Sequence, residues 1–230
     1  MKNGFHNSGT LYLLSTPIGN LEDITLRALR VLKEVDLIAA EDTRKTGILL
    51  KNYSITNRLT SYHDYNKEKK APWLLQELKS GKSIALVSDA GTPGISDPAY
   101  LMVKYTIEEE IRVESIPGPT AFVSALVVSG LPTDKFIFEG FLPAKSGKRR
   151  KRITELSDEK RTMIFYESPH RFLDTITDFI LILGDRRVCI ARELTKKFEE
   201  VKRGRLSKIR EYFETSKIRG EIVIIVEGRL

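Results

Sequence analysis

Short apolar runs alternate with helix-type patterns along most of the chain, and this alternation limits the possible folds more than any other feature. Residues 37–40 and 83–87 have the length of buried strands, and the segments around them place leucines at helical spacing. Strands that alternate with helices form βα units with parallel strands. We therefore predict an α/β fold. The predicted strands are residues 11–15, 37–40, 59–62, 83–87, 112–116, 136–139, 163–166, 188–192 and 222–227.

Capping residues and glycines mark where the intervening helices begin and end. Asp23 or Thr25 can cap the first helix, and Gly81 is placed to end the helix that carries Trp73. The sequence Pro117-Gly118-Pro119 interrupts the pattern and predicts a domain boundary. We expect an N-terminal domain over 1–118 with a mostly parallel sheet and a C-terminal domain over 119–230 with a mixed sheet. Further helices are predicted over 98–110, 121–129, 170–183 and 206–216.

Length and composition favour a folded, soluble, cytoplasmic protein. With 230 residues, 41% of them apolar, the chain can bury a substantial core. No apolar run approaches the roughly 18 residues needed to span a bilayer, and the first residues lack the features of an export signal. The single cysteine, Cys189, lies in an apolar run and is expected to be a buried thiol.

The charge favours a polyanionic partner. The formal net charge is +7, and six cations fall between positions 145 and 152. Clustered cations bind nucleic-acid phosphates through counterion release. The alternative is a solvated basic surface at the start of a helix, and both interpretations remain open. The cations of this run are Lys145, Lys148, Arg149, Arg150, Lys151 and Arg152.

Three turn-rich segments follow predicted strands and are the best candidates for a binding site. They are residues 16–20, 88–98 and 117–121, and all contain glycine and proline. In α/β proteins, ligands bind at the carboxyl ends of parallel strands, where glycine allows close approach to the backbone. The second segment is longer than a plain strand-to-helix connection requires. Its alternative interpretation is a long loop with a helix cap at Asp97.

Several common kinds of site have no support in the sequence. No Walker A motif and no G-x-G-x-x-G motif is present, so neither a P-loop site nor a standard dinucleotide site is predicted. His6, His63 and His170 are far apart and no cysteines are paired, so no metal site is expected. No G-x-S-x-G motif marks a hydrolase nucleophile.

Five ordered motifs together resemble one family. They are LYLLSTPIGNL at 11–21, AAEDTR at 39–44, VSDAGTP at 87–93, EGFLP at 139–143 and FYES at 165–168. In these motifs the chain resembles the bacterial 16S ribosomal RNA cytidine 2′-O-methyltransferases of the tetrapyrrole methylase superfamily, from about residue 9 to 228. The resemblance implies a homodimeric enzyme of two α/β domains, with S-adenosylmethionine in the cleft between the domains. Its implied substrate is a cytidine ribose in the decoding region of 16S ribosomal RNA.

The resemblance also implies which residues hold the cofactor. In the first half, the family's cofactor loops fall on Pro17, Ser88, Asp89, Ala90, Gly91, Ile95, Thr120 and Ala121. In the second half, Glu167, Leu194, Gly220 and Glu221 are similar to positions that complete the pocket.

Methyl transfer to a ribose hydroxyl requires that the enzyme position the hydroxyl and provide a base for its proton, and it needs no metal. Glu41, Asp42 and Glu167 are the candidate bases, and Tyr166 is a candidate for orienting the hydroxyl. For Glu41 and Asp42, helix capping is an equally good interpretation.

Further cations in or near the motifs are candidates for RNA phosphate contacts. They are Arg44, Lys45, His170, Arg171 and Arg192, in addition to the basic run. For Arg171, Arg192 and Glu193, structural ion pairing is the alternative.

One departure and two rival functions remain. Relatives of this type commonly continue into a small C-terminal helical domain, a plausible aid to RNA docking, whereas this sequence stops at Leu230. We expect catalysis to be possible without that domain, and the mode and strength of RNA binding stay open. The rivals are methylation of a tetrapyrrole carbon and a role as a non-catalytic RNA-binding assembly factor.

Overall fold

The computed structural model describes residues 8–215 and 218–229, and the chain divides into two compact units. Unit 1 is Met1–Thr120 and unit 2 is Ala121–Leu230, so the division falls close to the boundary expected at residue 118. His6 and Leu230 lie outside the described residues. Among the residues described, no helix is long and apolar enough to cross a membrane.

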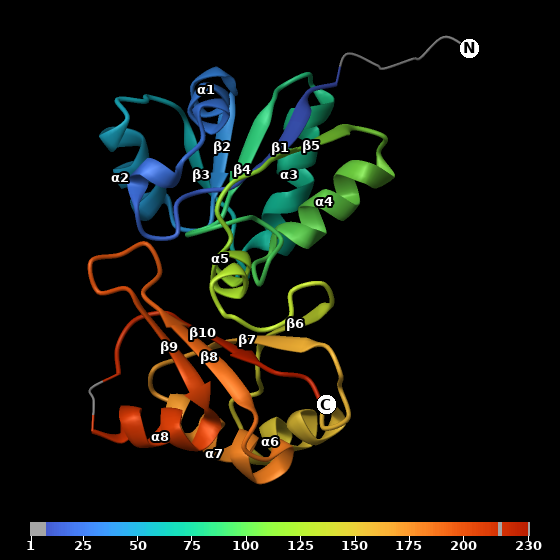
Figure 1. Cartoon of the computed structure of the whole chain (residues 1–230). Helices are drawn as coiled ribbons and strands as arrows, with labels where there is room; N and C mark the ends of the chain where they lie inside the picture. The colour runs from blue at the N-terminus through green and yellow to red at the C-terminus, as the bar shows by residue number, and fades with distance from the viewer. Residues whose placement is uncertain (1–7, 216–217, 230) are drawn as a thin grey trace. The chain divides into compact units, whose positions relative to one another are not determined.

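Unit 1 is a parallel sheet with helices on both faces, as Figure 1 shows. Its five strands lie in the order β3-β2-β4-β1-β5, and every neighbouring pair is parallel. The strands are β1 (Thr10–Leu14), β2 (Leu37–Ala40), β3 (Leu59–Ser61), β4 (Ile84–Val87) and β5 (Arg112–Ile116). The helical elements are η1 (Leu21–Asp23), α1 (Leu26–Glu34), α2 (Thr43–Asn52), α3 (Lys67–Lys79) and α4 (Ala99–Glu108).

The central strands of unit 1 are apolar throughout because both faces of the sheet are covered. Successive side chains of a strand point to opposite faces. In β2, Ile38 and Ala40 join the cluster that contains α1 and α2, whereas Leu37 and Ala39 join the cluster with α3 and α4. The near-continuous apolar runs in the sequence are therefore the signature of a parallel sheet buried on both sides.

Local signals set the helix ends in unit 1. The Thr25 hydroxyl accepts a hydrogen bond from the Ala28 N–H, which confirms the predicted cap of α1. Gly81 follows α3 with a φ of +92°, the left-handed conformation typical of a residue just beyond a helix.

Unit 2 contains a mixed sheet in the order β6-β7-β10-β8-β9. Only β6 and β7 are parallel, and the other neighbouring pairs are antiparallel. The strands are β6 (Phe136–Phe141), β7 (Thr162–Glu167), β8 (Arg187–Arg192), β9 (Glu200–Arg205) and β10 (Ile222–Val226). The helices are α5 (Ala121–Val127), α6 (Ser146–Glu155), α7 (Phe172–Leu183) and α8 (Leu206–Glu214).

The hydrophobic clusters on the two faces of this sheet differ in size. Phenylalanines of α7 and α8, including Phe172 and Phe213, pack against one face. The short helix α5 packs against the other face, where Cys189 is fully buried. Cys189 is thus the buried thiol that was expected, and its burial raises the pKa of the thiol to about 11.

Two elements of unit 2 were not among the sequence predictions. Strand β9 has the sequence EVKRGR, which lacks an apolar run, yet it pairs with β8 over its whole length. The second element is α6, which carries most of the basic run. The alternative interpretation of that run, a basic surface at the start of a helix, therefore describes its secondary structure.

Candidate functional site

The loops after β1, β4 and β5 meet at the carboxyl edge of the unit 1 sheet. Thr16 and Gly91 form an isolated antiparallel bridge, with N···O distances of 2.9 and 3.0 Å. Gly91 has a φ of +83°, which a residue with a side chain rarely adopts. The first two turn-rich segments of the sequence are therefore joined through their backbones.

Three hydroxyl groups join all three loops. The Thr92 Oγ1 atom lies 2.9 Å from Ser15 Oγ and 2.7 Å from Thr120 Oγ1. It also lies within 3.3 Å of the Pro119 carbonyl oxygen. Thr92 thus connects the loops that follow β1, β4 and β5. Sequence reasoning did not single out Ser15 or Thr92, although Thr92 lies inside the second turn-rich segment and Ser15 directly precedes the first.

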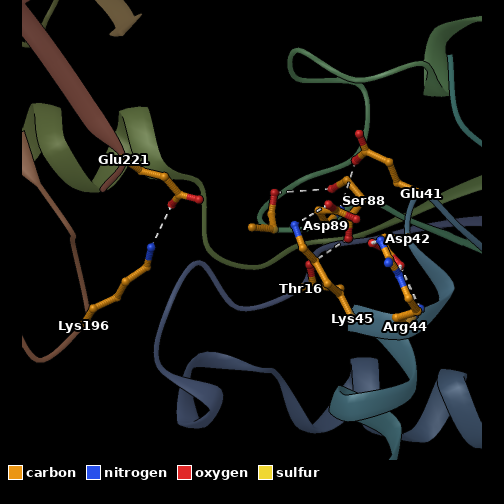
Figure 2. A network of polar contacts seen from close by, with 10 residues as sticks. Thr16, Glu41, Asp42, Arg44, Lys45, Ser88, Asp89, Lys196 and Glu221 are labelled. Carbon is orange, nitrogen blue, oxygen red and sulfur yellow. Dashed lines mark hydrogen bonds and ion pairs between the residues drawn. The ribbon is translucent and has the colours of Figure 1, made fainter. Parts of the chain in front are cut away.

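An acidic cluster lies beside the loop after β4 (Figure 2). The Asp89 N–H donates to Glu41 Oε2 over 3.1 Å, and Lys45 Nζ lies 2.6 Å from Asp89 Oδ2. The Thr16 hydroxyl donates to the Ser88 carbonyl over 3.3 Å. The ends of β1, β2 and β4 therefore share one network of polar contacts.

Burial raises the pKa of two carboxyl groups at this end of the sheet, Glu41 and Asp97. Burial raises the pKa of the Glu41 carboxyl, and the nearby Asp89 and Asp97 carboxylates raise it further, against the Asp89 N–H and Lys45. Burial also raises the pKa of Asp97, against the backbone N–H groups of Gly94 and Ala99, to which its carboxylate is bonded. Those bonds fix the end of the loop before α4, whose N-cap is Pro98 rather than the Asp97 of the alternative interpretation. Asp89 Oδ1 is buried without a hydrogen-bond partner in the described part of the chain, so an acceptor is available there.

The Asp42 carboxylate is already bonded to groups at the start of its own helix, α2. It is the N-cap of α2, and its carboxylate accepts hydrogen bonds from the Arg44 backbone N–H and guanidinium. The Arg44 side chain and N–H hold the pKa of Asp42 well below its usual range. The capping interpretation therefore holds for Asp42, and Arg44 is an exposed cation that contacts it.

The remaining cofactor candidates of the first half lie on the same loops. Pro17 follows the bridging Thr16, and Ala90 lies on the exposed surface of the loop after β4. The Ile95 N–H donates to the Thr92 carbonyl over 3.3 Å. Ala121, the first residue of α5, belongs to unit 2.

A second group of candidate residues lies at one edge of the unit 2 sheet. In the strand register, Ile222 at the start of β10 pairs with Glu167 at the end of β7 and with Arg192 at the end of β8. The segments after β7 and β8 and before β10 therefore meet. This arrangement brings together Glu167, Leu194, Gly220 and Glu221.

Glu167 is fully engaged inside unit 2. Its side chain is buried and contacts Arg171 Nη2 at 2.6 Å, the Thr175 hydroxyl at 2.6 Å and the Ser168 N–H at 2.7 Å. The structural ion pair considered for Arg171 is thus present. Because all these donors hold its carboxylate, Glu167 serves the packing of α7 against β7.

Glu193, Lys196 and Glu221 form a compact charged cluster after β8. Lys196 Nζ lies 2.9 Å from Glu193 Oε1 and 3.1 Å from Glu221 Oε2, and the second contact is drawn in Figure 2. Gly220 has a φ of +84°, and a Cβ there would lie 2.3 Å from the Glu193 side chain. Leu194 packs against the smaller core of unit 2. The partner of Arg192 is Glu200 rather than Glu193.

Tyr166 lies within an aromatic cluster and has a neutral hydroxyl group. Its ring lies 5.0 Å from that of Phe138 and 5.5 Å from that of Phe141, measured between centroids. Burial raises the pKa of Tyr166 to about 12. Its hydroxyl is therefore protonated at neutral pH and can orient a group but not act as a base.

The basic run divides between the core and the surface. The Arg149 side chain is 4% exposed and its Nε lies 2.7 Å from the buried Asp178 carboxylate, so it holds α6 on α7. Arg150, 54% exposed, contacts the same carboxylate. Lys145 and Lys148 are exposed. Of the basic run, only the cations on the outer face of α6 and just before it are presented to solvent.

Among the described residues, no group of three or more His, Cys, Asp and Glu side chains could hold a metal ion.

The comparisons agree with this architecture. The family model of the Tetrapyrrole (Corrin/Porphyrin) Methylases matches residues 10–210, and the chain belongs to that family. Within the family it is similar to proteins named ribosomal RNA small subunit methyltransferase I. The relative from Halalkalibacterium halodurans is 54% identical over 96% of this chain and 77% of its own length. That from Escherichia coli O157:H7 is 51% identical over 97% and 79%, and that from Thermotoga maritima is 50% identical over 96% and 99%.

Solved structures share the fold at low sequence identity. A cobalt precorrin-4 methyltransferase of cobalamin biosynthesis superposes with a TM-score of 0.71 at 19% identity, covering 99% of this chain and 97% of its own. The uroporphyrin-III C-methyltransferase of Thermus thermophilus, solved with S-adenosyl homocysteine, has a TM-score of 0.66 at 19% identity, covering 95% and 97%. These likenesses establish the α/β fold of the family.

Proposed function

We propose that this protein transfers a methyl group from S-adenosylmethionine to the 2′-hydroxyl of a cytidine ribose in the decoding region of 16S ribosomal RNA. We further propose that it does so in the cytoplasm as a homodimer. The observation that carries the proposal is sequence identity of about half, over nearly the whole chain, to proteins named as methyltransferases of the small ribosomal subunit.

The loops of unit 1 have the properties that S-adenosylmethionine requires. Both backbone groups of Gly91 are bonded to Thr16, which fixes the backbone after β4, and the missing side chain at Gly91 leaves room for a ligand to approach closely. Asp89 Oδ1 is a buried acceptor without a partner among the described residues, and the cofactor has hydroxyl and ammonium donors that would satisfy it. We therefore assign the cofactor to Pro17, Ser88–Gly91, Ile95 and Thr120 of unit 1.

When bound, the cofactor supplies an electrophilic methyl group on a positively charged sulfur. The chain's own residues must then orient the ribose hydroxyl and accept its proton. Glu41 is the best candidate base, because burial raises its pKa and thereby strengthens it as a proton acceptor. Asp42 and Glu167 are excluded from this proposal because local donors already hold their carboxylates. Tyr166 would orient a hydroxyl through its protonated phenol.

We propose that exposed cations contact the RNA backbone. Arg44, Lys45, Lys145, Lys148 and Arg150 all present side chains to solvent. Each phosphate contact releases counterions, so binding would weaken steeply with salt. We do not assign RNA contacts to Arg149 and Arg171, because buried or half-buried carboxylate pairs hold them.

The rival substrates are less well supported. The two solved tetrapyrrole methyltransferases are 19% identical to this chain, which supports a shared fold and leaves the substrate open. A non-catalytic assembly factor would have no need for an intact network among Ser15, Thr92 and Thr120.

Glu41→Gln tests the assigned base. Glutamine keeps an oxygen that can accept the Asp89 N–H, so S-adenosylmethionine affinity should stay within about threefold. Methyl transfer to small ribosomal subunits should fall by roughly 100-fold or more, the usual contribution of a positioned base. Equal transfer rates for Glu41→Gln and the unaltered protein would remove Glu41 from the mechanism.

A further inference from the structure

The turn between β8 and β9 carries an exposed aromatic residue among cations. Phe198 is 67% exposed and lies in the segment that extends beyond the two strands in Figure 1. Its neighbour Lys197 places its ammonium 5.7 Å from the ring centroid.

The turn is held rigidly at its base. Glu193 and Thr195 have φ values of +51° and +66°, a left-handed conformation that is uncommon for residues with side chains. The Thr195 N–H donates to the Glu199 carboxylate over 2.6 Å, and Lys196 contacts Glu193. Such strain persists where the surrounding structure fixes it, and it concentrates at functional sites. The conformation presents Phe198 and Lys197 outward.

A second aromatic–cation pair continues along the same hairpin. On β9, Lys202 Nζ lies 3.9 Å from the ring centroid of Tyr212, an exposed residue of α8. The Tyr212 hydroxyl donates to Glu200 over 2.8 Å. Lys202 lies on the strand that directly follows the turn with Phe198.

The charge of the hairpin favours a polyanion. Residues 193–205 include five basic and three acidic side chains. The carboxylates of Glu193, Glu199 and Glu200 are each bonded to a local donor. The hairpin thus has an excess of basic side chains and one exposed ring, Phe198, while its carboxylates are already bonded to local donors.

We infer that the β8–β9 hairpin is a stacking platform for unpaired RNA bases, with Phe198 as its main contact and Lys197 beside it on the phosphate. Aromatic rings interleaved with cations are the means by which proteins hold single-stranded nucleic acid. A duplex hides the base faces, so the platform selects unpaired nucleotides. This inference rests on the proposed function, because it names how the rRNA substrate is held.

The test compares Phe198→Ala with Phe198→Trp in binding a fluorescent oligocytidylate, measured by fluorescence anisotropy. Loss of a stacked base should weaken binding of the single strand about fivefold or more, whereas tryptophan should keep it within about twofold. The same strand annealed to its complement should bind both variants equally. Lys197→Met should lower the slope of log affinity against log salt by about one.

Leu181→Ala is the matched control, because Leu181 is an exposed apolar residue of α7 in the same unit. It should leave RNA binding unchanged. Unaltered single-strand binding by Phe198→Ala would overturn the inference, and so would a change in the sedimentation of the free protein, which would mark a self-association surface. Calorimetry with S-adenosylmethionine separates the two proposals, because failure of the unaltered protein to bind the cofactor would refute the proposed function and leave the RNA comparison readable.

Discussion

Replacement of Thr92 by valine tests whether one hydroxyl group holds the three loops of unit 1 together. Valine has nearly the same shape but lacks the hydroxyl that contacts Ser15, Thr120 and the Pro119 carbonyl. Each such hydrogen bond contributes about 0.5–1.5 kcal/mol net. The hydroxyls of Ser15 and Thr120 can rotate toward other partners, so part of this free energy is recovered.

We expect Thr92→Val to lower the free energy of unfolding by about 1–2 kcal/mol. If the loops form the cofactor site, the affinity for S-adenosylmethionine should also fall. Binding would have to supply about 1 kcal/mol to restore the arrangement of the loops, which corresponds to a loss of affinity of roughly 5–10-fold. Urea unfolding followed by Trp73 fluorescence measures the first quantity, and titration calorimetry measures the second.

Thr106→Val is the matched control for this prediction. Thr106 is fully buried in α4, and its hydroxyl donates to the Met102 carbonyl over 2.7 Å, away from the loops. This variant should leave cofactor affinity unchanged. If Thr92→Val binds S-adenosylmethionine as tightly as the unaltered protein, the hydroxyl network does not organise the cofactor site and the reasoning is refuted.

Three further predictions concern single side chains. Arg149→Met should lower the free energy of unfolding by about 3–5 kcal/mol, because it leaves a buried carboxylate without its main partner; a melting temperature near that of the unaltered protein would contradict this. Because folding raises the pKa of Glu41, its contribution to stability is present below the unfolded pKa and is lost as the pH rises through the folded pKa. Urea unfolding from about pH 4 to 7 should show a smaller loss of stability with rising pH for Glu41→Gln, and identical pH profiles would count against the assignment. Gly220→Ala should cost about 1–2 kcal/mol or more through its left-handed conformation and its clash with Glu193, whereas Gly147→Ala, which has free space in α6, should stabilise by up to about 1 kcal/mol; equal melting temperatures would contradict both expectations.

The fold could be predicted from the sequence wherever burial dictates an apolar pattern. The strands at 37–40 and 112–116 have the predicted bounds, since parallel strands and their turn residues leave a clear pattern. Strand β9 could not be predicted, because its edge position requires no apolar face and its sequence, EVKRGR, is mostly charged. Only its antiparallel pairing with the preceding strand, β8, defines it as a strand.

The candidate site was predicted in outline because topology brings the carboxyl ends of parallel strands together. Which groups each carboxylate contacts could not be predicted, since the contacts depend on partners distant in sequence or on side-chain geometry. Asp42 caps a helix, and Glu167 is buried against Arg171 and Thr175. For Arg149 a signal was present, because Ile153 lies four residues later on the same helical face and is also buried.

The most direct test of the account is transfer of labelled methyl from S-adenosylmethionine to purified, unmethylated small ribosomal subunits. Asp89→Ala and Gly91→Trp alter the cofactor loop and are compared with the unaltered protein in the same assay. The account predicts label on a cytidine ribose of 16S ribosomal RNA, lost in both variants. A protein that binds no S-adenosylmethionine, or that leaves the subunits unlabelled while methylating a free tetrapyrrole, would contradict it.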